Sequence, residues 1–351
     1  MRVLVTTDTV GGVWTHALDL ARGLGGAGVD VVLATMGARL RADQRADADS
    51  VGLAALHESD FALEWMQAQW EAVDAAGDWL LDIAHAESVD VVHSNSFTHG
   101  ALDWMRPVVV VGHSCVVSWW RAVHGEDPPP KWDEYRHRVS AGLRAADAAV
   151  APTRAMLHEL ERAYGVTGMV IHNGSSVPEA TRDKEPFILA AGRMWDRAKG
   201  LDLLDRAAAS IPWPVLAAGA GGSATAVRTL GQLPQRELTA LRERASVFIA
   251  PARYEPFGLG ILEAARAGCA LVLADIPSLR ELCTDAAVFV DPADTRALHE
   301  QLSRLIADGD ARTRLGHAAR LRARRYTVER MACAYSALYQ RVSGARKELT
   351  A

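Results

Sequence analysis

The chain lacks the features that mark several classes of protein. Its 351 residues contain only four cysteines, at positions 115, 269, 283 and 333, and none stands in a C-x-x-C spacing. This usage argues against a disulfide framework or a zinc site and favours a reducing compartment. No apolar run approaches the length of a membrane span. A net charge of −5 without a basic domain argues against a dedicated nucleic-acid binder.

The N-terminus also lacks the pattern of a secretory signal peptide, because Met1 and Arg2 lead directly into a short apolar run. We therefore expect a cytoplasmic protein with no nucleic-acid partner and no stable membrane association. Nothing in the sequence pattern indicates an oligomeric state.

What the chain does contain is a regular alternation of short apolar runs and amphipathic stretches, the pattern of βαβ units and parallel sheets. Its length suits two domains. We predict two Rossmann-like, doubly wound α/β domains over residues 1–175 and 176–327, joined by the turn-rich segment 172–184. Ligands of such folds bind at the carboxyl ends of the strands, so we expect the site in the cleft between the domains.

The predicted elements follow from this alternation. Strands are expected at 3–6, 29–35, 89–93, 108–113, 148–151 and 170–172, and then at 187–191, 215–218, 227–230, 247–251, 270–274 and 287–290. Helices are expected at 13–27, 61–85, 132–146, 153–164, 295–307 and 311–325, with a final helix at 328–343.

The most informative segment is RYEPFGLGILEA at 253–264, between two apolar runs. A helix beginning at Gly258 would direct free backbone N–H groups toward a phosphate. Glu255, before that helix, and Glu263, within it, can accept hydrogen bonds from ligand hydroxyls on the same side. An anion site flanked by two carboxylates fits a nucleotide sugar. The alternative is a βαβ unit with two solvated glutamates.

Two other loops suit a diphosphate. Arg193 and Lys199 lie six residues apart after the first strand of the second half, so both cations can converge on one diphosphate. They can stabilise a leaving nucleoside diphosphate without metal, so we expect no metal and no cofactor; ordinary surface cations are the alternative. Gly11 and Gly12 follow the first strand and allow a close approach to phosphate or sugar, although such turns are common.

A histidine and several tryptophans also stand near predicted strand ends. His113 ends an apolar strand at the edge where open α/β sheets bind ligands, although a structural histidine fits the pattern equally well. Eight of the ten tryptophans precede residue 135, and core packing explains most of them. Those closest to strand ends are expected to stack on an acceptor: Trp14, Trp119 and Trp120.

Four of these landmarks, in this order, resemble those of the retaining GT-B glycosyltransferases of family 4. They are the Gly11-Gly12 loop, His113, the Arg193/Lys199 pair in a G-R-x(5)-K-G pattern, and Glu255/Glu263 in an E-x7-E element. The resemblance covers nearly the whole chain. One departure is Ser175-Ser176, where the family usually has an apolar–acidic pair after Asn-Gly, which puts any contact from that acidic position in doubt.

The resemblance implies transfer of a sugar from a nucleoside diphosphate to an acceptor with retained anomeric configuration. Glu255 would hold sugar hydroxyls and Glu263 the ribose, while His113 would help to place the sugar. Arg193 and Lys199 would hold the departing diphosphate in a front-face reaction. The turn at Gly231 and Leu233 would hold the nucleobase. The donor set is Gly11, Gly12, Arg193, Lys199, Gly231, Leu233, Glu255, Phe257, Gly258, Leu259 and Glu263, and the catalytic set is His113, Glu255, Arg193 and Lys199.

The resemblance makes UDP the default nucleotide and UDP-glucose the first donor to test. Segments 42–50 and 57–64 of the first domain carry six acids against one arginine. Because anionic lipid headgroups would repel such a surface, we expect a soluble small-molecule or saccharide acceptor. The alternatives are a nucleotide-sugar 2-epimerase of the same fold, a nicotinamide-dependent oxidoreductase, disfavoured by the missing G-x-G-x-x-G, and a nucleotide-binding regulatory module.

Overall fold

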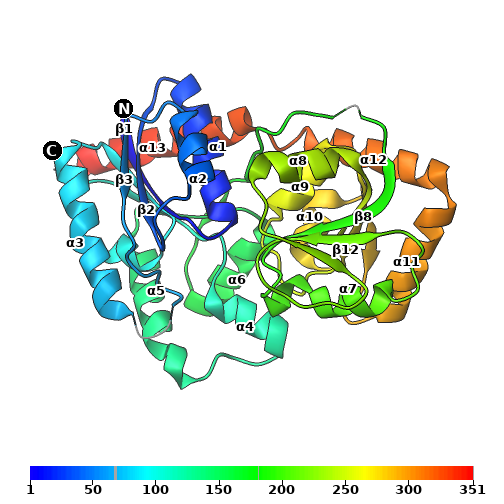
Figure 1. Ribbon diagram of the computed structural model, residues 1–351. Coiled ribbons are helices and arrows are strands. Elements are labelled where there is room, and N and C mark those ends of the chain that lie inside the picture. The colour runs from blue at the N-terminus through cyan, green and yellow to red at the C-terminus, as the bar shows by residue number, and fades with distance from the viewer. Residues whose placement is uncertain (67–68, 181, 351) are drawn as a thin grey trace. The chain divides into compact units, whose positions relative to one another are not determined.

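The computed structural model describes residues 1–66, 69–180 and 182–350. The chain forms two compact units, which Figure 1 shows in the colours of the sequence. Unit 1 comprises Met1–Arg121, Glu126–Gly174 and Val328–Ala351, and unit 2 comprises Ala122–Gly125 and Ser175–Thr327. Each is built on a parallel sheet with helices, which confirms the predicted fold class.

In its described residues, unit 1 contains a seven-stranded parallel sheet of order β3-β2-β1-β4-β5-β6-β7. Connections run outward in both directions from the neighbours β1 and β4, so the crevice at their carboxyl ends is the topological switch point. The strands are β1 (Arg2–Asp8), β2 (Asp30–Met36), β3 (Ala55–Glu58), β4 (Val91–Ser94), β5 (Val108–Val111), β6 (Ala148–Ala151) and β7 (Met169–Val170).

The helices of unit 1 include one from the end of the chain. They are α1 (Gly12–Gly26), α2 (Ala42–Asp49), α3 (Trp70–Ala86), η1 (Thr98–Ala101), α4 (Val116–His124, shared with unit 2), η2 (Pro130–Trp132), α5 (Asp133–Ala145), α6 (Arg154–Tyr164) and α13 (Val328–Thr350). Figure 1 shows α13 in red beside α1. A Cβ at Gly23 would lie 2.7 Å from Ala332 Cβ, so the glycine permits this close packing. Tyr335 and Tyr339 of α13 are fully buried in the core.

The sequence prediction was wrong about one helix start and missed four elements of unit 1. The helix expected over 61–85 begins at Trp70 instead; residues 67–68 of that range lie outside the described residues. Glu64 is held in a loop because its carboxylate accepts hydrogen bonds from the backbone N–H groups of Phe97 and Thr98. The missed elements are all short: α2, β3, η1 and α4. No residue of β3 is fully buried.

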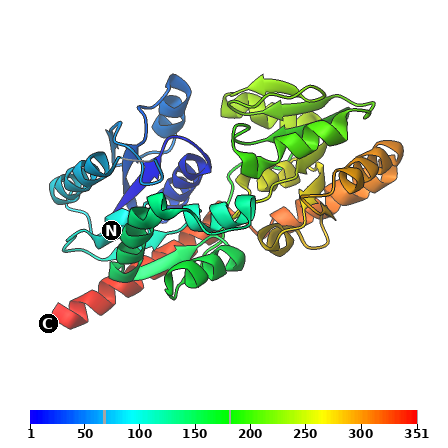
Figure 2. The same ribbon diagram turned by 90° about the horizontal axis from the view of Figure 1, so that it is seen from below.

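In the described residues of unit 2, the parallel sheet has six strands in the order β10-β9-β8-β11-β12-β13. They are β8 (Glu185–Ala191), β9 (Val215–Ala218), β10 (Arg228–Gly231), β11 (Ala245–Ala250), β12 (Ala270–Ala274) and β13 (Val288–Val290). The helices are η3 (Arg197–Lys199), α7 (Leu201–Ala208), α8 (Gln235–Arg244), α9 (Leu259–Arg266), α10 (Pro277–Cys283), α11 (Thr295–Ala307) and α12 (Gly309–Ala323). Figure 2 shows α11 and α12, in orange, lying side by side.

Two loops of unit 2 touch at the carboxyl edge of the sheet. A Cβ on Gly219, which has φ +144°, would lie 1.6 Å from the carbonyl oxygen of Gly192. Only glycine fits this approach, and it fixes the loop after β9 against the loop after β8. The loop after β8 carries Arg193 and Lys199.

Candidate active site

The loop between β11 and α9 has the geometry of an anion site. Gly258 precedes α9 with φ +89°, a left-handed conformation that favours glycine. A Cβ there would lie 2.8 Å from Ile261 Cδ1 and 3.3 Å from Glu255 Cγ. No side chain caps this helix start. The first N–H groups of α9 and its positive end therefore suit a ligand phosphate.

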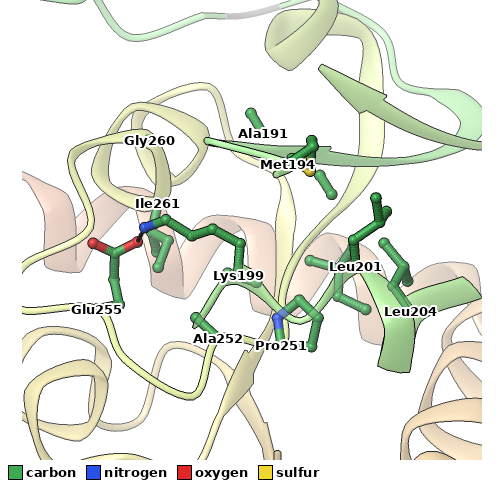
Figure 3. Close-up of a pocket in the computed structure, with 13 residues that line it drawn as sticks. Ala191, Met194, Lys199, Leu201, Leu204, Pro251, Ala252, Glu255, Gly260 and Ile261 are labelled. Atoms are coloured by element: carbon green, nitrogen blue, oxygen red, sulfur yellow. Dashed lines mark hydrogen bonds and ion pairs between the residues drawn. The ribbon is translucent and has the colours of Figure 1, made fainter. Parts of the chain in front are cut away.

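Glu255 and Lys199 meet beside this helix start. Lys199 Nζ donates a hydrogen bond of 2.6 Å to Glu255 Oε2, and the two side chains are 17% and 19% exposed. Figure 3 shows the pair at a small cavity of about 40 Å³, whose apolar wall includes Met194, Leu201 and Leu204. Lys199 follows β8 and Glu255 follows β11, which are neighbouring strands. The fold thus joins two of the predicted site residues.

Arg193 occupies the same loop as Lys199 but has a different partner. Its Nη2 donates a 3.2 Å hydrogen bond to Asp196 Oδ2, and its guanidinium lies 5.6 Å from the centre of the Trp195 ring. The Asp196 carboxylate also accepts from the Ala198 backbone N–H and so begins η3. Trp195 is half exposed, so this loop presents a cation backed by an aromatic ring.

Glu263 of α9 is buried, so it is not the solvated glutamate of the alternative interpretation. Its residue is 2% exposed, and Oε2 lies 2.5 Å from Arg242 Nη1. Its Oε1 accepts a 3.1 Å hydrogen bond from Gln235 Nε2. A carboxylate has about four lone-pair positions, so acceptor capacity remains beside these partners. Sequence reasoning missed Arg242 and Gln235, because neither stands in a motif.

The other predicted donor residues of unit 2 offer mainly backbone. Gly231 has φ +70°, is exposed, and its carbonyl accepts a 2.8 Å hydrogen bond from Gly219. Leu233 and Leu259 are half-buried. Phe257 is 3% exposed and packs edge-to-face on Tyr326, so its ring belongs to the core and only its backbone is available to a ligand.

In unit 1, Gly11 and Gly12 lie as expected in the segment that leads from β1 into α1, with Gly11 at the helix N-cap and Gly12 as the first helical residue. The stacking role expected of Trp14 is not supported, because the residue is 6% exposed and packs in the core. Trp119 and Trp120 of α4 are half-buried and contact each other edge-to-face at 6.0 Å.

The acidic surface expected over segments 42–50 and 57–64 is largely neutralised, because arginines inside and next to these segments contact the carboxylates. Arg41 contacts Asp43 at 2.9 Å and Arg45 contacts Glu58 at 2.5 Å. Glu64 is buried, where it anchors the η1 segment. The electrostatic argument for repulsion from lipid is therefore weaker than the sequence suggested.

His113, itself half-buried, belongs to a cluster with two fully buried histidines. Its Nε2 lies 2.8 Å from Asn95 Oδ1, and the His16 ring contacts it edge-to-face at 4.4 Å. His93 Nε2 lies 3.2 Å from the same Asn95 oxygen. Burial, with the neighbouring His93, lowers the pKa of His113 to about 3, and burial lowers that of His93 to about 4. Both rings are thus neutral near pH 7.

His16 is the third ring of this cluster. It is fully buried, and neither of its nitrogens has a hydrogen-bond partner in the described residues. Burial, followed by His113 and His93, lowers the pKa of His16 well below its usual value. In the described part of the chain, no group of three or more His, Cys, Asp or Glu side chains could hold a metal ion.

Two glycosyltransferase family models match the chain in succession. Residues 10–177 match Glycosyltransferase Family 4, and residues 175–322 match glycosyl transferases group 1. The D-inositol 3-phosphate glycosyltransferase of Xylanimonas cellulosilytica is 27% identical over 97% of this chain and 94% of the relative.

Solved structures share the fold at low identity. Sucrose-phosphate synthase from Thermosynechococcus elongatus superposes with a TM-score of 0.81 at 18% identity, over 98% of this chain and 100% of that one. Anabaena HepE in complex with UDP-glucose gives 0.73 at 15%, over 99% and 100%. The two parallel-sheet α/β units define a GT-B fold. With both halves matched by glycosyltransferase models, the chain is a glycosyltransferase of the GT-B superfamily. Among the described residues, no helix is long and apolar enough to span a membrane.

The buried histidines predict a pH dependence of stability. Their pKa values are lower in the folded state than the ordinary value of 6.5, so the unfolded chain binds more protons below that pH. The free energy of unfolding is therefore highest above pH 6.5 and falls as the pH drops toward the folded pKa values. For His93 alone the loss between pH 7 and pH 5 is about 2 kcal/mol.

Thermal unfolding followed from pH 7 to pH 5 measures this loss. His16→Phe should make the decline in Tm shallower, since it removes one of the groups that gain a proton on unfolding. His158→Ala is the matched control, because this histidine of α6 is exposed. Equal pH dependence of wild type and His16→Phe would contradict the buried, neutral state of His16.

Proposed function

We propose that the protein is a retaining glycosyltransferase of family 4 that transfers glucose from UDP-glucose, without a metal, to a soluble small-molecule or saccharide acceptor. The observation that carries this proposal is the Lys199–Glu255 pair at a small cavity beside the start of α9. There an ammonium, a helix N-terminus and a carboxylate stand within reach of one ligand. This combination suits a diphosphate joined to a hydroxyl-rich sugar.

The charges of this site suit the departure of a nucleoside diphosphate. In the proposed reaction Lys199 and Arg193 leave their carboxylate partners, Glu255 and Asp196, for the phosphate oxygens. They then stabilise the negative charge that develops as the glycosidic bond breaks. Glu255, released from Lys199, accepts hydrogen bonds from sugar hydroxyls.

The acceptor attacks from the same face as the leaving group, and a phosphate oxygen takes its proton. Catalysis then depends on positioning and electrostatic stabilisation rather than on a protein nucleophile. Glu263 accepts the ribose hydroxyls with the lone pairs that Arg242 and Gln235 leave open. The solved complex of Anabaena HepE with UDP-glucose supports the choice of donor.

Substitutions of Glu255 and Glu263 should differ in their effect on UDP binding. Glu255→Ala should retain UDP binding and lose sugar turnover, because its carboxylate contacts the sugar. Glu263→Ala and the milder Glu263→Gln should weaken UDP itself, tenfold or more for the alanine variant, since charge-assisted hydrogen bonds are worth roughly 1.5–3 kcal/mol each. Calorimetric titration with UDP measures both effects.

Glu237→Ala serves as the control, because this glutamate of α8 is exposed. Glu263→Ala also leaves Arg242 without its carboxylate, so each variant should first be checked for a cooperative thermal transition. UDP affinities that are equal in wild type and all glutamate variants would contradict the assigned roles.

Activity should survive EDTA, because Arg193 and Lys199 supply the positive charge that a divalent ion supplies in other transferases. The measurement is UDP release from UDP-glucose, with a panel of polyol phosphates and saccharides as acceptors, before and after chelation. Activity that is lost with EDTA and restored by Mg²⁺ or Mn²⁺ would contradict the metal-independent mechanism.

The proposed acceptor predicts weak binding to anionic membranes. The net charge is −5, and the arginines near α2 are engaged with Asp43 and Glu58. The names of two similar proteins, which refer to inositol 3-phosphate and sucrose phosphate, also favour a soluble acceptor. The protein should stay in the supernatant when sedimented with anionic liposomes at physiological salt.

A double variant, Asp43→Ala with Glu58→Ala, provides the comparison. It frees Arg41 and Arg45 and should increase binding to the same liposomes, most strongly at low salt. Strong, salt-sensitive pelleting of the unmodified protein would instead favour a lipid-linked acceptor.

A further inference from the structure

The orientation of one side-chain amide determines the hydrogen-bond roles around His113. Asn95 follows β4 and lies beside Thr6 of β1. Its backbone N–H donates to Thr6 Oγ1 at 2.9 Å, and its Nδ2 donates to the Thr6 carbonyl at 2.7 Å. Because a backbone carbonyl only accepts hydrogen bonds, the amide nitrogen must face Thr6. The oxygen Oδ1 therefore faces the histidines.

Two imidazoles share that oxygen. His113 Nε2 lies 2.8 Å and His93 Nε2 3.2 Å from Asn95 Oδ1. An amide oxygen carries no hydrogen, so both Nε2 atoms must donate. In a neutral imidazole the other nitrogen is then an acceptor. His93 Nδ1 lies 2.7 Å from Tyr339 Oη, which fits this assignment because the phenol can donate.

We propose that Tyr339, His93 and Asn95 are positioning residues that hold His113 as its Nε2–H tautomer, so that its Nδ1 lone pair accepts a hydroxyl of the bound sugar. The hydroxyl as ligand rests on the proposed function, whereas the tautomer follows from the hydrogen bonds alone. No hydrogen bond to His113 Nδ1 is found in the described part of the chain. His113 is half-buried, in contrast to the fully buried His93.

The network connects the last helix of the chain to His113. Tyr339 lies on α13, His93 on β4, Asn95 after β4, and His113 after β5. Burial keeps both rings neutral, which preserves the acceptor on Nδ1, because an imidazolium has two donors and no acceptor. Because the pKa of His113 is about 3, its ring is neutral across the physiological pH range.

The helix α13 also supplies a matched control. Tyr335 lies one turn before Tyr339, and its ring centre is 4.9 Å from that of His93. Its hydroxyl is buried and has no hydrogen-bond partner in the described residues. Tyr335→Phe therefore removes the same atom from the same helix without breaking the network, whereas Tyr339→Phe removes the donor to His93 Nδ1.

The first test is nuclear magnetic resonance of the full-length protein labelled with ¹⁵N-histidine, with long-range ¹H–¹⁵N correlations that identify each tautomer. Both His93 and His113 should be Nε2–H forms from pH 7.5 to pH 5.5. Tyr339→Phe should shift the His93 Nδ1 resonance, and Tyr335→Phe should leave it near its original position. Asn95→Ala should release His113 into a mixture of tautomers, and Asn95→Gln, which keeps an acceptor oxygen and a donor nitrogen, should restore part of the Nε2–H form.

Turnover of UDP-glucose supplies the second test. Asn95→Ala should lower kcat/KM at least tenfold and Asn95→Gln should recover part of it, while the affinity for UDP, which lacks the sugar, stays unchanged in both. An Nδ1–H form of His113 in the unmodified protein, or equal spectra for the two tyrosine variants, would overturn the proposal. Correct tautomers without turnover of any nucleotide sugar would instead overturn the proposed function.

Discussion

The parallel order of both sheets is the constraint on which the candidate site depends. When neighbouring strands run in the same direction, each must be followed by a crossover, and the residues after every strand gather at one edge. In unit 2, Lys199 follows β8 and Glu255 follows β11, and their side chains meet at 2.6 Å although they are 56 residues apart. In unit 1 the same rule brings Asn95 and His113 together after β4 and β5.

Two charged contacts within unit 2 hold the helices α8 and α9 in place. Arg242 of α8 and Glu263 of α9 form an ion pair whose side chains are 4% and 3% exposed. Lys184 Nζ donates to backbone carbonyls at the ends of the same two helices, those of Arg242, Glu243 and Ala267. Desolvation offsets much of the attraction within a buried ion pair. We therefore interpret the Arg242–Glu263 ion pair as a contact that orients the Glu263 carboxylate rather than as a source of stability.

Much of the fold was predictable from the sequence, because a buried parallel strand needs an apolar run and a crossover helix needs an amphipathic one. Prediction failed at β3, whose four residues are all partly exposed, and at the segment around Glu64, whose shape depends on hydrogen bonds to residues more than thirty positions away. No local pattern encodes such contacts.

The candidate site likewise contains residues that the sequence predicts and residues that it does not. Lys199, Glu255 and Gly258 stand in short motifs whose spacing reflects local geometry. Arg242, Asn95 and Tyr339 carry no such signal, since each acquires its partner through tertiary structure. Trp14 shows the opposite error: its place near the end of a strand suggested a ligand contact, but the side chain is buried in the core.

The last helix shows that a unit of this fold is not one continuous stretch of the chain. Unit 1 ends at Gly174 and resumes at Val328, so α13 reaches it only after all of unit 2. Tyr335, Leu338 and Tyr339 of this helix are buried in the core of unit 1. Residues 1–174 alone would expose the surface that these side chains cover and would leave His93 without its hydroxyl partner. The environment of His113 is therefore complete only when the C-terminal segment packs against α1.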